Sequence, residues 1–421
     1  MGVADSGVFA WIFIRSDETR FMTTAMRIGL FTNNYRPLVN GLATSVEGFA
    51  QAFRRAGHAV TVVAPRYPGS PEGEPDVLRV PGLRAPTHHA YVLPMAWWPG
   101  VGRAVAALQL DIFHAQHPTL LGAAAARWAR RANRSLVFTY HTYYDRYAHY
   151  VPGPSRLVAR MAVRQATAFA NRADLVIAPG PSVARVLRAQ GVTSPIAIVP
   201  TGVTLPGPAE EAKRIRRRQA LGSKEGTPLC LSVGRLAREK NQAFLLTAFA
   251  AILTRLPAAR LLLVGEGDDR PRLEKMTCDL GIGGSVQFVG AVPHERVGDY
   301  YLAADLFLFP STSETQGIVV LEAMAAGLPV VAVASDAAAD LLGDGETGVM
   351  TPEDLPGFVG AVADLWGQPE RRRAMAAAAR RIAAGYAPDA CASTLLDLYR
   401  DVIRAHQTAP VRGRLAHPSE A

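Results

Sequence analysis

Two acidic residues eight positions apart, Glu314 and Glu322, follow an apolar run near the end of a repeating pattern. The run Leu306–Phe309 predicts a buried strand, and Gly317 is predicted to open the helix that contains Glu322. A carboxylate in the intervening loop can accept hydrogen bonds from sugar hydroxyls, and a second one farther along can bind a ribose. The same residues also fit an ordinary helix with an acidic start and a solvated Glu322.

The first turn of this predicted helix is a candidate anion site. Its unpaired backbone N–H groups belong to Gly317, Ile318 and Val319. Such groups bind phosphate and other anions, and the helix dipole adds to the attraction. The segment therefore predicts an anion site beside a sugar-binding carboxylate.

A cationic pair follows another predicted strand, Leu229–Val233. Arg235 offers a planar fork of donors that fits a diphosphate, and Lys240 offers a compact positive charge. Two cations aimed at one diphosphate would stabilise a departing nucleotide as its negative charge develops. A surface loop with ordinary salt bridges is the alternative interpretation.

Two residues in the first half of the chain extend this set. Gly41 lies in the loop after the predicted strand Arg27–Phe31, where a glycine lets the backbone approach a ligand, although a simple turn would also use one. His141 stands at the end of the predicted strand Ser135–Tyr140, where it could hydrogen-bond a transferred sugar or orient the reacting groups. A packed, backbone-bonded histidine is the alternative.

Several other motifs are missing from the chain. Gly265-Glu266-Gly267 is followed by Arg270 where a dinucleotide-binding fingerprint needs a third glycine. The sequence has no Walker A loop, and no group of His, Asp and Glu has metal-ligand spacing. The three cysteines form no Cys-x-x-Cys pair. We therefore expect no metal and no other cofactor, and a reducing, cytoplasmic setting.

The elements that must position these residues alternate between strand and helix. Such alternation predicts an α/β fold of two doubly wound parallel-sheet domains that face each other across a cleft. Ligands of open α/β sheets bind beyond the carboxyl ends of the strands, where the candidate residues lie. The predicted strands are 27–31, 59–64, 111–115, 135–140, 175–178 and 196–199 in the first half, and 229–233, 260–264, 286–289, 306–309 and 330–333 in the second.

Pro206-Gly207-Pro208 interrupts this alternation and predicts a domain boundary. Residues 1–25 contain an apolar run of seven residues, which is too short to span a membrane. We interpret Met26 as the true start of the chain, or residues 1–25 as a loose appendage. The expected divisions are an appendage at 1–25, domains at 26–204 and 205–385, a helix at 386–407 that crosses back to the first domain, and a loose tail at 408–421.

The excess positive charge is confined to the first half of the chain. Residues 1–204 contain 21 Arg, no Lys and 10 Asp or Glu, a balance of +11, whereas residues 205–421 have a balance of −2. This asymmetry indicates nucleic acid or an acidic membrane surface as a partner, unless it only reflects free use of arginine. Two clusters contribute to it, namely Arg127, Arg130 and Arg131 with Arg134, and Arg156, Arg160 and Arg164.

The second cluster forms a stripe on the predicted helix Ser155–Asn171, beside the apolar residues Leu157 and Met161. Interfacial helices combine these features, and anionic lipids attract them. Nucleic acid would use the same charge, but no recognition motif or aromatic stacking platform accompanies it, so no nucleic-acid partner is expected. A solvated helix face is the alternative.

Together these residues resemble the retaining glycosyltransferases of GT-B fold that carry the Glu-x7-Glu motif, the glycosyl transferases group 1. The resemblance runs from residue 27 to about 405. It implies that Glu314 holds the donor sugar, that Glu322 holds the ribose, and that Arg235 and Lys240 bind the diphosphate. The first domain would then take the acceptor and the second the nucleotide-sugar donor, without a divalent metal.

The same resemblance assigns the remaining residues. Gly41 matches the glycine-rich loop near the donor, and His141 matches the histidine that contacts the transferred sugar. Val289 and Gly290 match the backbone that receives the base. The catalytic set implied by the family is His141, Glu314, Arg235 and Lys240.

Three segments look most like bacterial diacylglycerol glucosyltransferases: residues 33–41, residues 140–144 and Ser313-Glu314-Thr315-Gln316-Gly317. Gln316 replaces an aromatic residue that many members carry. The expected reaction is retaining transfer of glucose from UDP-glucose to a lipid such as 1,2-diacylglycerol, at the inner face of the cell membrane. The alternatives are GDP-mannose-dependent transfer to phosphatidylinositol, a polysaccharide or a soluble acceptor, and nucleotide-sugar binding without turnover.

Overall fold

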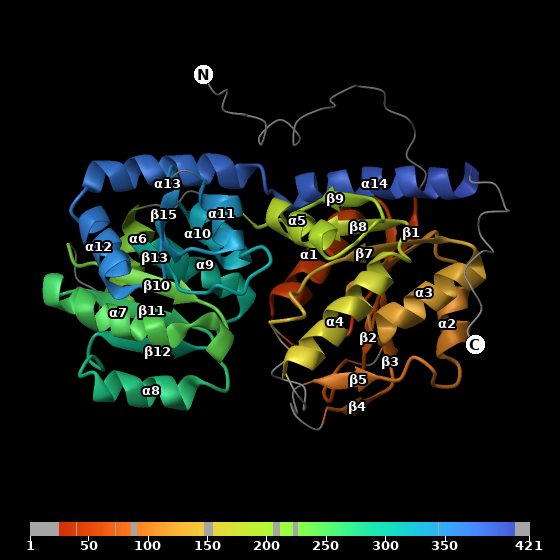
Figure 1. Ribbon diagram of the computed structural model, residues 1–421, viewed down its shortest axis with the longest axis horizontal. Helices are drawn as coiled ribbons and strands as arrows, with labels where there is room; N and C mark the ends of the chain where they lie inside the picture. Colours follow the sequence, from red (N-terminus) through yellow and green to blue (C-terminus); the bar gives the residue numbers. More distant parts are fainter. Residues whose placement is uncertain are drawn as a thin grey trace, which may run out of the picture.

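The computed structural model describes residues 25–38, 40–71, 73–85, 91–146, 155–204, 211–221, 226–343 and 345–408. Two α/β lobes lie side by side in Figure 1, with the first half of the chain in red to yellow and the second in green to blue. A long blue helix, α14 (Pro388–Thr408), returns from the second lobe and lies along the first.

The first lobe is built on a seven-stranded parallel sheet in the order β3-β2-β1-β6-β7-β8-β9. Three of its strands, β6, β7 and β8, are buried along their whole length, as expected for a parallel sheet covered on both faces. The strands are β1 (Arg27–Phe31), β2 (Ala59–Pro65), β3 (Val77–Val80), β6 (Ile112–Ala115), β7 (Ser135–Thr139), β8 (Leu175–Ala178) and β9 (Ile196–Ile198), and a separate hairpin pairs β4 (Gly82–Arg84) with β5 (Val92–Pro94).

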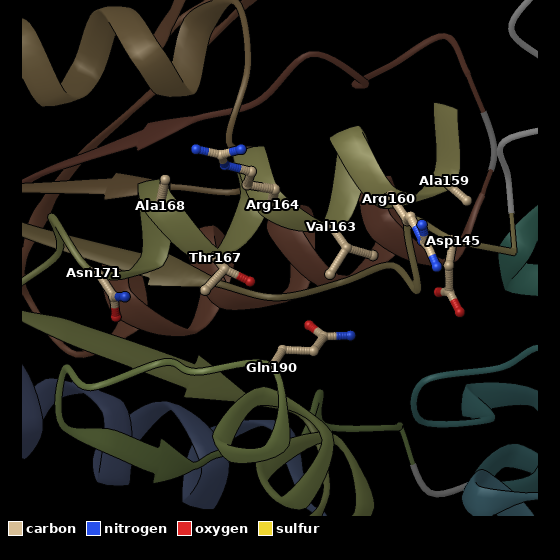
Figure 2. A pocket seen from close by; sticks show the side chains of 9 residues that line it. All are labelled: Asp145, Ala159, Arg160, Val163, Arg164, Thr167, Ala168, Asn171 and Gln190. Atoms are coloured by element: carbon tan, nitrogen blue, oxygen red, sulfur yellow. The ribbon is translucent and has the colours of Figure 1, made fainter. Parts of the chain in front are cut away.

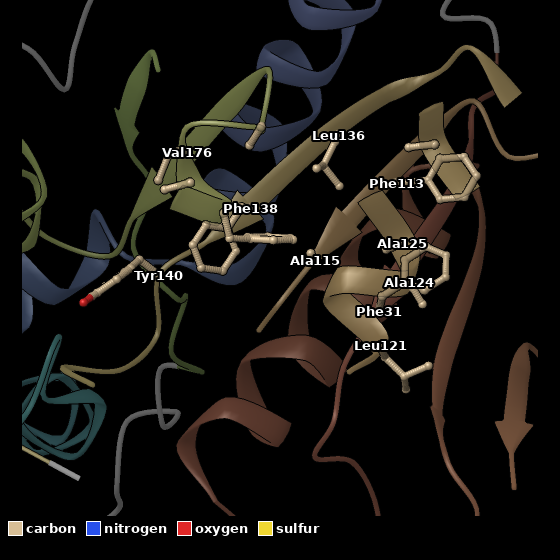
Figure 3. Packing of buried hydrophobic residues seen from close by; sticks show 14 of the residues in the cluster. Phe31, Phe113, Ala115, Leu121, Ala124, Ala125, Leu136, Phe138, Tyr140 and Val176 are labelled. Carbon is tan, nitrogen blue, oxygen red and sulfur yellow. The ribbon is translucent and has the colours of Figure 1, made fainter. Parts of the chain in front are cut away.

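Alternate residues of a strand point to opposite faces of this sheet. On β7, Leu136 and Phe138 belong to the core shown in Figure 3, and Val137 between them belongs to the core on the opposite face. The first core packs under α2 (Val101–Ala107), α3 (Leu121–Ala132), α4 (Ser155–Ala170) and α5 (Pro181–Ala189), and the second under α1 (Gly41–Arg55) and α14.

The second lobe contains a six-stranded parallel sheet in the order β12-β11-β10-β13-β14-β15. Helices cover both of its faces, so the predicted fold class of two doubly wound parallel sheets is confirmed. The strands are β10 (Leu229–Val233), β11 (Arg260–Val264), β12 (Val286–Gly290), β13 (Leu306–Phe309), β14 (Val330–Val333) and β15 (Gly348–Thr351). The helices are α7 (Gln242–Arg255), α8 (Arg270–Asp279) and α12 (Leu355–Trp366) on one face, α9 (His294–Ala303), α10 (Ile318–Ala326), α11 (Asp336–Leu342) and α13 (Pro369–Ala384) on the other, and α6 (Glu211–Ala220) beside α9.

The structure also contains elements that the sequence pattern did not predict, among them β3, β15, α5, α11 and α12. Of the unpredicted strands, β3 and β15 lie at sheet edges and are only partly buried. Gly41, predicted to lie in a loop, is instead the first residue of α1, because Asn40 caps the helix by accepting a 2.9 Å hydrogen bond from the Ala43 N–H. Helix α10 begins at Ile318, one residue later than predicted, with Gly317 as its cap.

The chain passes between the lobes twice, first at residues 199–203 and again, on its return, at residues 386–388. The two crossings touch. Val199 is buried in a core of the first lobe and Val203 in a core of the second. The Val203 N–H donates to the C=O of Tyr386, on the return crossing, at 2.9 Å. A Cβ on Gly202 would lie only 2.5 Å from the Cα of Pro388, so a glycine is required where the crossings meet.

Helix α14 is fixed to the first lobe by a buried histidine. The hydroxyl of Tyr399 lies 2.5 Å from Nδ1 of His114, whose Nε2 lies 2.7 Å from Oγ1 of Thr139. Burial lowers the pKa of His114 to about 3, so the ring is neutral near pH 7. Both ring nitrogens therefore have partners in a site that water does not reach.

Replacing Tyr399 by Phe should lower the free energy of unfolding by about 1–3 kcal/mol, because a buried nitrogen of His114 loses its partner. Chemical denaturation measures this change. Arg404, exposed on the same helix, provides the control, and Arg404→Ala should change stability by less than about 0.5 kcal/mol. An equal loss in both variants would contradict the anchoring role of Tyr399.

Candidate active site

An ion pair joins the two loops that carry the strongest candidate residues. Lys240 ends a short 3-10 helix after β10, and its Nζ lies 2.5 Å from Oε1 of Glu314, in the loop after β13. Because β10 and β13 are neighbours in a parallel sheet, their carboxyl ends bring these loops together. The two side chains are only 13% and 24% exposed, which limits the screening of their attraction.

Arg235 lies in the same loop as Lys240 and forms an ion pair with Glu239. The C=O of Glu239 accepts a 3.0 Å hydrogen bond from Oγ of Ser313, and the side chain of Asn241 donates to the C=O of Pro310 at 3.3 Å. These contacts hold the loop after β10 against the loop after β13, so the cations and the carboxylate keep a fixed relation.

Glycines allow the neighbouring loops to pack backbone against backbone. A Cβ on Gly265 would lie 1.9 Å from the carbonyl oxygen of Gly234, which leaves no room for any other residue. The Gly265 N–H donates to the C=O of Gly290 at 2.9 Å, and Gly290 has a φ of +84° at the end of β12. Val289 precedes it and is half-buried. Strand β12 lies next to β11, and β11 lies next to β10. The backbone predicted to receive a base therefore lies two strands along the sheet from the loop after β10.

The start of α10 faces the first lobe. Gly317 has a φ of +71°, and within the described residues the N–H groups of Ile318 and Val319 have no hydrogen-bond acceptor. A Cβ on Gly41 would lie 3.6 Å from Cδ1 of Ile318. The first turn of α1 therefore meets the first turn of α10, close to the loop of Glu314.

Glu322 lies just over one turn into α10 and is held by a tyrosine. Tyr301, buried on α9, donates its hydroxyl to Oε2 of Glu322 at 2.7 Å. Burial, together with the charge of Glu322, raises the pKa of Tyr301 well above its ordinary value, so the hydroxyl remains a donor. The carboxylate is oriented by this bond and is not a freely solvated group.

His141 follows β7 in the first lobe and reaches the same region. Its C=O accepts a 2.9 Å hydrogen bond from Oγ1 of Thr315, the residue after Glu314. Its Nε2 lies 2.7 Å from Oε1 of Gln116, and because an amide oxygen only accepts, Nε2 carries the proton. Burial, with a smaller effect from two nearby histidines, lowers the pKa of His141 to about 3, so the ring is neutral and Nδ1 is an acceptor.

The two arginine clusters lie away from these residues, on α3 and α4. All six side chains are exposed, and none forms an ion pair within the described part of the chain: Arg127, Arg130 and Arg131 on α3, and Arg156, Arg160 and Arg164 on α4. Arg160 and Arg164 line a cavity of about 540 Å³ between α4 and Gln190 at the end of α5, shown in Figure 2.

Sequence reasoning missed three partners of the candidate residues. Gln116 directly follows β6, as His141 follows β7. Because ligands of such sheets bind at the loops after strands, Gln116 could have been predicted in the same way as His141. Glu239 lies in the loop after β10, four residues after Arg235, so the same reasoning would have found it. Tyr301 lies within α9 and carries no such signal, because its contact depends on the side-chain directions of two packed helices.

The arrangement can bind an anionic sugar ligand. Arg235, Lys240 and the free N–H groups of α10 are suited to phosphate oxygens, and the two carboxylates are suited to hydroxyl groups. In the part of the chain that the structure describes, no group of His, Cys, Asp and Glu is placed to hold a metal ion.

Comparison with known proteins agrees with this geometry. Residues 39–205 match Glycosyltransferase Family 4, and residues 213–382 match Glycosyl transferases group 1. The alpha-monoglucosyldiacylglycerol synthase of Acholeplasma laidlawii is 30% identical over 339 residues, which cover 77% of this chain and 84% of that protein. A GDP-mannose-dependent alpha-(1-6)-phosphatidylinositol monomannoside mannosyltransferase of Mycolicibacterium smegmatis is 32% identical over 371 residues, covering 83% and 92%.

The fold comparison agrees as well. A sucrose-phosphate synthase from Thermosynechococcus elongatus superposes with a TM-score of 0.75 at 25% identity, over 90% of this chain and 99% of that one. The two facing sheets and the site between them define a glycosyltransferase of GT-B fold. The chain belongs to the glycosyl transferases group 1, glycosyltransferase family 4, and is a retaining hexosyltransferase.

Replacing Glu314 by Gln should lower the turnover number at least about 100-fold, because the charge that holds Lys240 in place is lost. Initial rates of sugar transfer measure this, and the melting temperature checks folding. Glu346→Gln makes the same chemical change in an exposed ion pair and should leave turnover unchanged. Full activity of the Glu314→Gln enzyme would refute its place in the site.

Proposed function

We propose that this enzyme transfers glucose from UDP-glucose to a lipid acceptor such as 1,2-diacylglycerol, at the inner face of the cell membrane. The observation that carries the lipid acceptor is an exposed apolar and basic surface on one face of the first lobe. The similarity to a monoglucosyldiacylglycerol synthase, and the Ser313–Gly317 segment typical of diacylglycerol glucosyltransferases, favour glucose and a glycerolipid.

The donor site follows from the contacts in the second lobe. Arg235 and Lys240 bind the diphosphate, with the N–H groups at the start of α10. Glu314 accepts hydrogen bonds from the sugar, and Glu322, oriented by Tyr301, accepts them from the ribose. The backbone of Val289 and Gly290 contacts the base.

The chemistry requires charge stabilisation on the leaving side of the sugar. As the bond to the diphosphate breaks, negative charge develops on its oxygen, where Arg235, Lys240 and the α10 dipole stabilise it. The sugar becomes oxocarbenium-like, and the acceptor hydroxyl attacks from the same face and passes its proton to the departing diphosphate oxygen. A neutral His141 accepts a hydrogen bond from the sugar at Nδ1 without placing a positive charge beside this centre.

The membrane-facing surface combines apolar and basic residues on α2, α3 and α4, which pack on the same face of the first sheet. Trp97, just before α2, is 71% exposed and Met161, on α4, is 64% exposed. Trp98 follows Trp97 directly, and Leu157 lies one helical turn before Met161; both are also exposed. Aromatic and apolar side chains flanked by arginines suit an anionic bilayer surface. Among the described helices, none is long and apolar enough to cross a membrane.

A second candidate is transfer of mannose from GDP-mannose to phosphatidylinositol. It is favoured by the similarly high identity, 32%, to the mannosyltransferase of Mycolicibacterium smegmatis. The same surface would serve this acceptor, because phosphatidylinositol is itself an anionic lipid.

A panel of UDP- and GDP-sugars against diacylglycerol and phosphatidylinositol tests the proposed substrates directly. We expect UDP-glucose with diacylglycerol to give a product heavier than the lipid by one hexose, and to react at least about tenfold faster than any other pair. Mass spectrometry of the extracted lipids identifies the product. Product only from GDP-mannose would replace the proposal by the second candidate, and product only with a water-soluble acceptor would refute a lipid substrate.

The membrane surface predicts how variants bind vesicles. The double variant Trp97→Ser/Trp98→Ser should bind vesicles of phosphatidylcholine and phosphatidylglycerol at least about tenfold more weakly, because two large apolar side chains no longer insert. Arg160→Gln/Arg164→Gln should weaken binding most at low salt. Arg373→Gln/Arg381→Gln, exposed on α13, is the matched control and should bind normally. An equal loss of vesicle binding in the control variant would refute the proposal that this surface binds the membrane.

A further inference from the structure

Residues 199–203 form the connector between the lobes, and its middle residue belongs to neither hydrophobic core. Val199 is buried in one core and Val203 in the other, and Thr201 lies between them. Thr201 is only 6% exposed, although it belongs to neither core, because other side chains cover it. Its backbone polar groups therefore need partners from within the protein.

Both of these partners come from one side chain in the donor lobe. The Thr201 N–H donates to Oε1 of Gln316 at 2.9 Å, and Nε2 of Gln316 donates to the C=O of Thr201 at 3.0 Å. Gln316 is 7% exposed and lies two residues after Glu314 and one before Gly317. An aromatic residue at this position, as in many family members, could not make both bonds, because none offers a donor and an acceptor in this geometry.

The connector is also tied to the first lobe at the same residue. Oγ1 of Thr201 lies 2.8 Å from Oγ of Ser45, on α1, four residues after Gly41. On the other side of Gln316, Thr315 donates to the C=O of His141 at 2.9 Å. The loop of Glu314 is thus bonded to the connector and, through it, to α1.

We propose that Gln316 is a positioning residue that couples the sugar-binding loop to the interdomain connector, so that Glu314 is placed for transfer only in one relative orientation of the lobes. This inference rests on the sugar-binding role proposed for Glu314. Movement of the connector relative to the loop would leave two buried backbone groups and the buried Gln316 amide unpaired. A change in the angle between the lobes is therefore transmitted to Glu314.

Another contact between the lobes provides a control that does not involve this loop. Ser182, at the start of α5, donates from its hydroxyl to Oδ1 of Asp340, on α11, at 2.7 Å. Ser182→Ala removes this bond between the lobes, keeps the 2.9 Å bond from the Ser182 N–H to the same carboxylate, and leaves both bonds of Gln316 in place. It separates a general weakening of the interface from a specific effect on the loop of Glu314.

The test compares Gln316→Met, which has a similar length without the amide, with Ser182→Ala and the unchanged protein. Turnover is measured with UDP-glucose and dioleoylglycerol in mixed micelles, and also as hydrolysis of UDP-glucose without lipid. The Kd of UDP is measured by calorimetry, and the melting temperature by differential scanning. All rates are taken at least 10 degrees below the melting temperature of the least stable variant.

We expect Gln316→Met to lower both rates at least about tenfold, while the Kd of UDP changes less than about threefold, because Arg235 and Glu322 keep their own partners, Glu239 and Tyr301. Ser182→Ala should keep both rates within about threefold of the unchanged protein. Gln316→Asn keeps the amide but is one carbon too short, so it should lose activity like Gln316→Met, and it serves as the second variant where Gln316→Met does not fold.

Three results would overturn the proposal: unchanged turnover in Gln316→Met, an equal loss in Ser182→Ala, or a loss of UDP affinity as large as the loss of turnover. Its failure is distinct from a failure of the sugar site. An active Glu314→Gln enzyme removes the role of Glu314 itself, whereas an active Gln316→Met enzyme beside an inactive Glu314→Gln enzyme removes only the coupling.

Discussion

The ion pair between Lys240 and Glu314 is the contact on which the donor side of this enzyme depends. It joins the loops after β10 and β13 and is largely shielded from water, so it holds a carboxylate and a cation at a fixed separation. The ammonium group has three N–H donors, and it can bind Glu314 with one while it offers another to a phosphate oxygen. One residue can therefore orient the carboxylate proposed to bind the sugar and stabilise the leaving diphosphate, which is the kind of preorganisation that favours a charged transition state.

The remaining contacts extend this fixed geometry across the two lobes. His141 reaches the loop of Glu314 through Thr315, and burial keeps its ring neutral, which suits a position beside a sugar that gains positive charge. The connector meets the same loop through Gln316, and the return crossing packs against Gly202. Helix α14 then fixes the returning chain to the first lobe through Tyr399 and His114. The two lobes are thus linked at the candidate active site and at the crossings.

Sequence patterns predicted the centre of the fold better than its edges. Strands β10, β11, β13 and β14 were predicted to the residue, because each is a short apolar run buried on both faces. Of the edge strands, β3 and β15 were missed, whereas β9 and β12, which are also partly exposed, were predicted to within one residue. In the site, the loops after strands pointed to Glu314 and Lys240, but no pattern shows that they form a pair. Gln316 was visible only as a departure from the family, since its partner Thr201 lies 115 residues away in the sequence.

The most direct test of the donor site is a crystal structure of the enzyme with a non-transferable analogue of UDP-glucose. We predict that Nζ of Lys240 lies within hydrogen-bond distance of a diphosphate oxygen, and that the carboxylate of Glu314 contacts a hydroxyl of the sugar. A sugar bound away from Glu314, with the diphosphate beyond the reach of both Arg235 and Lys240, would contradict the account.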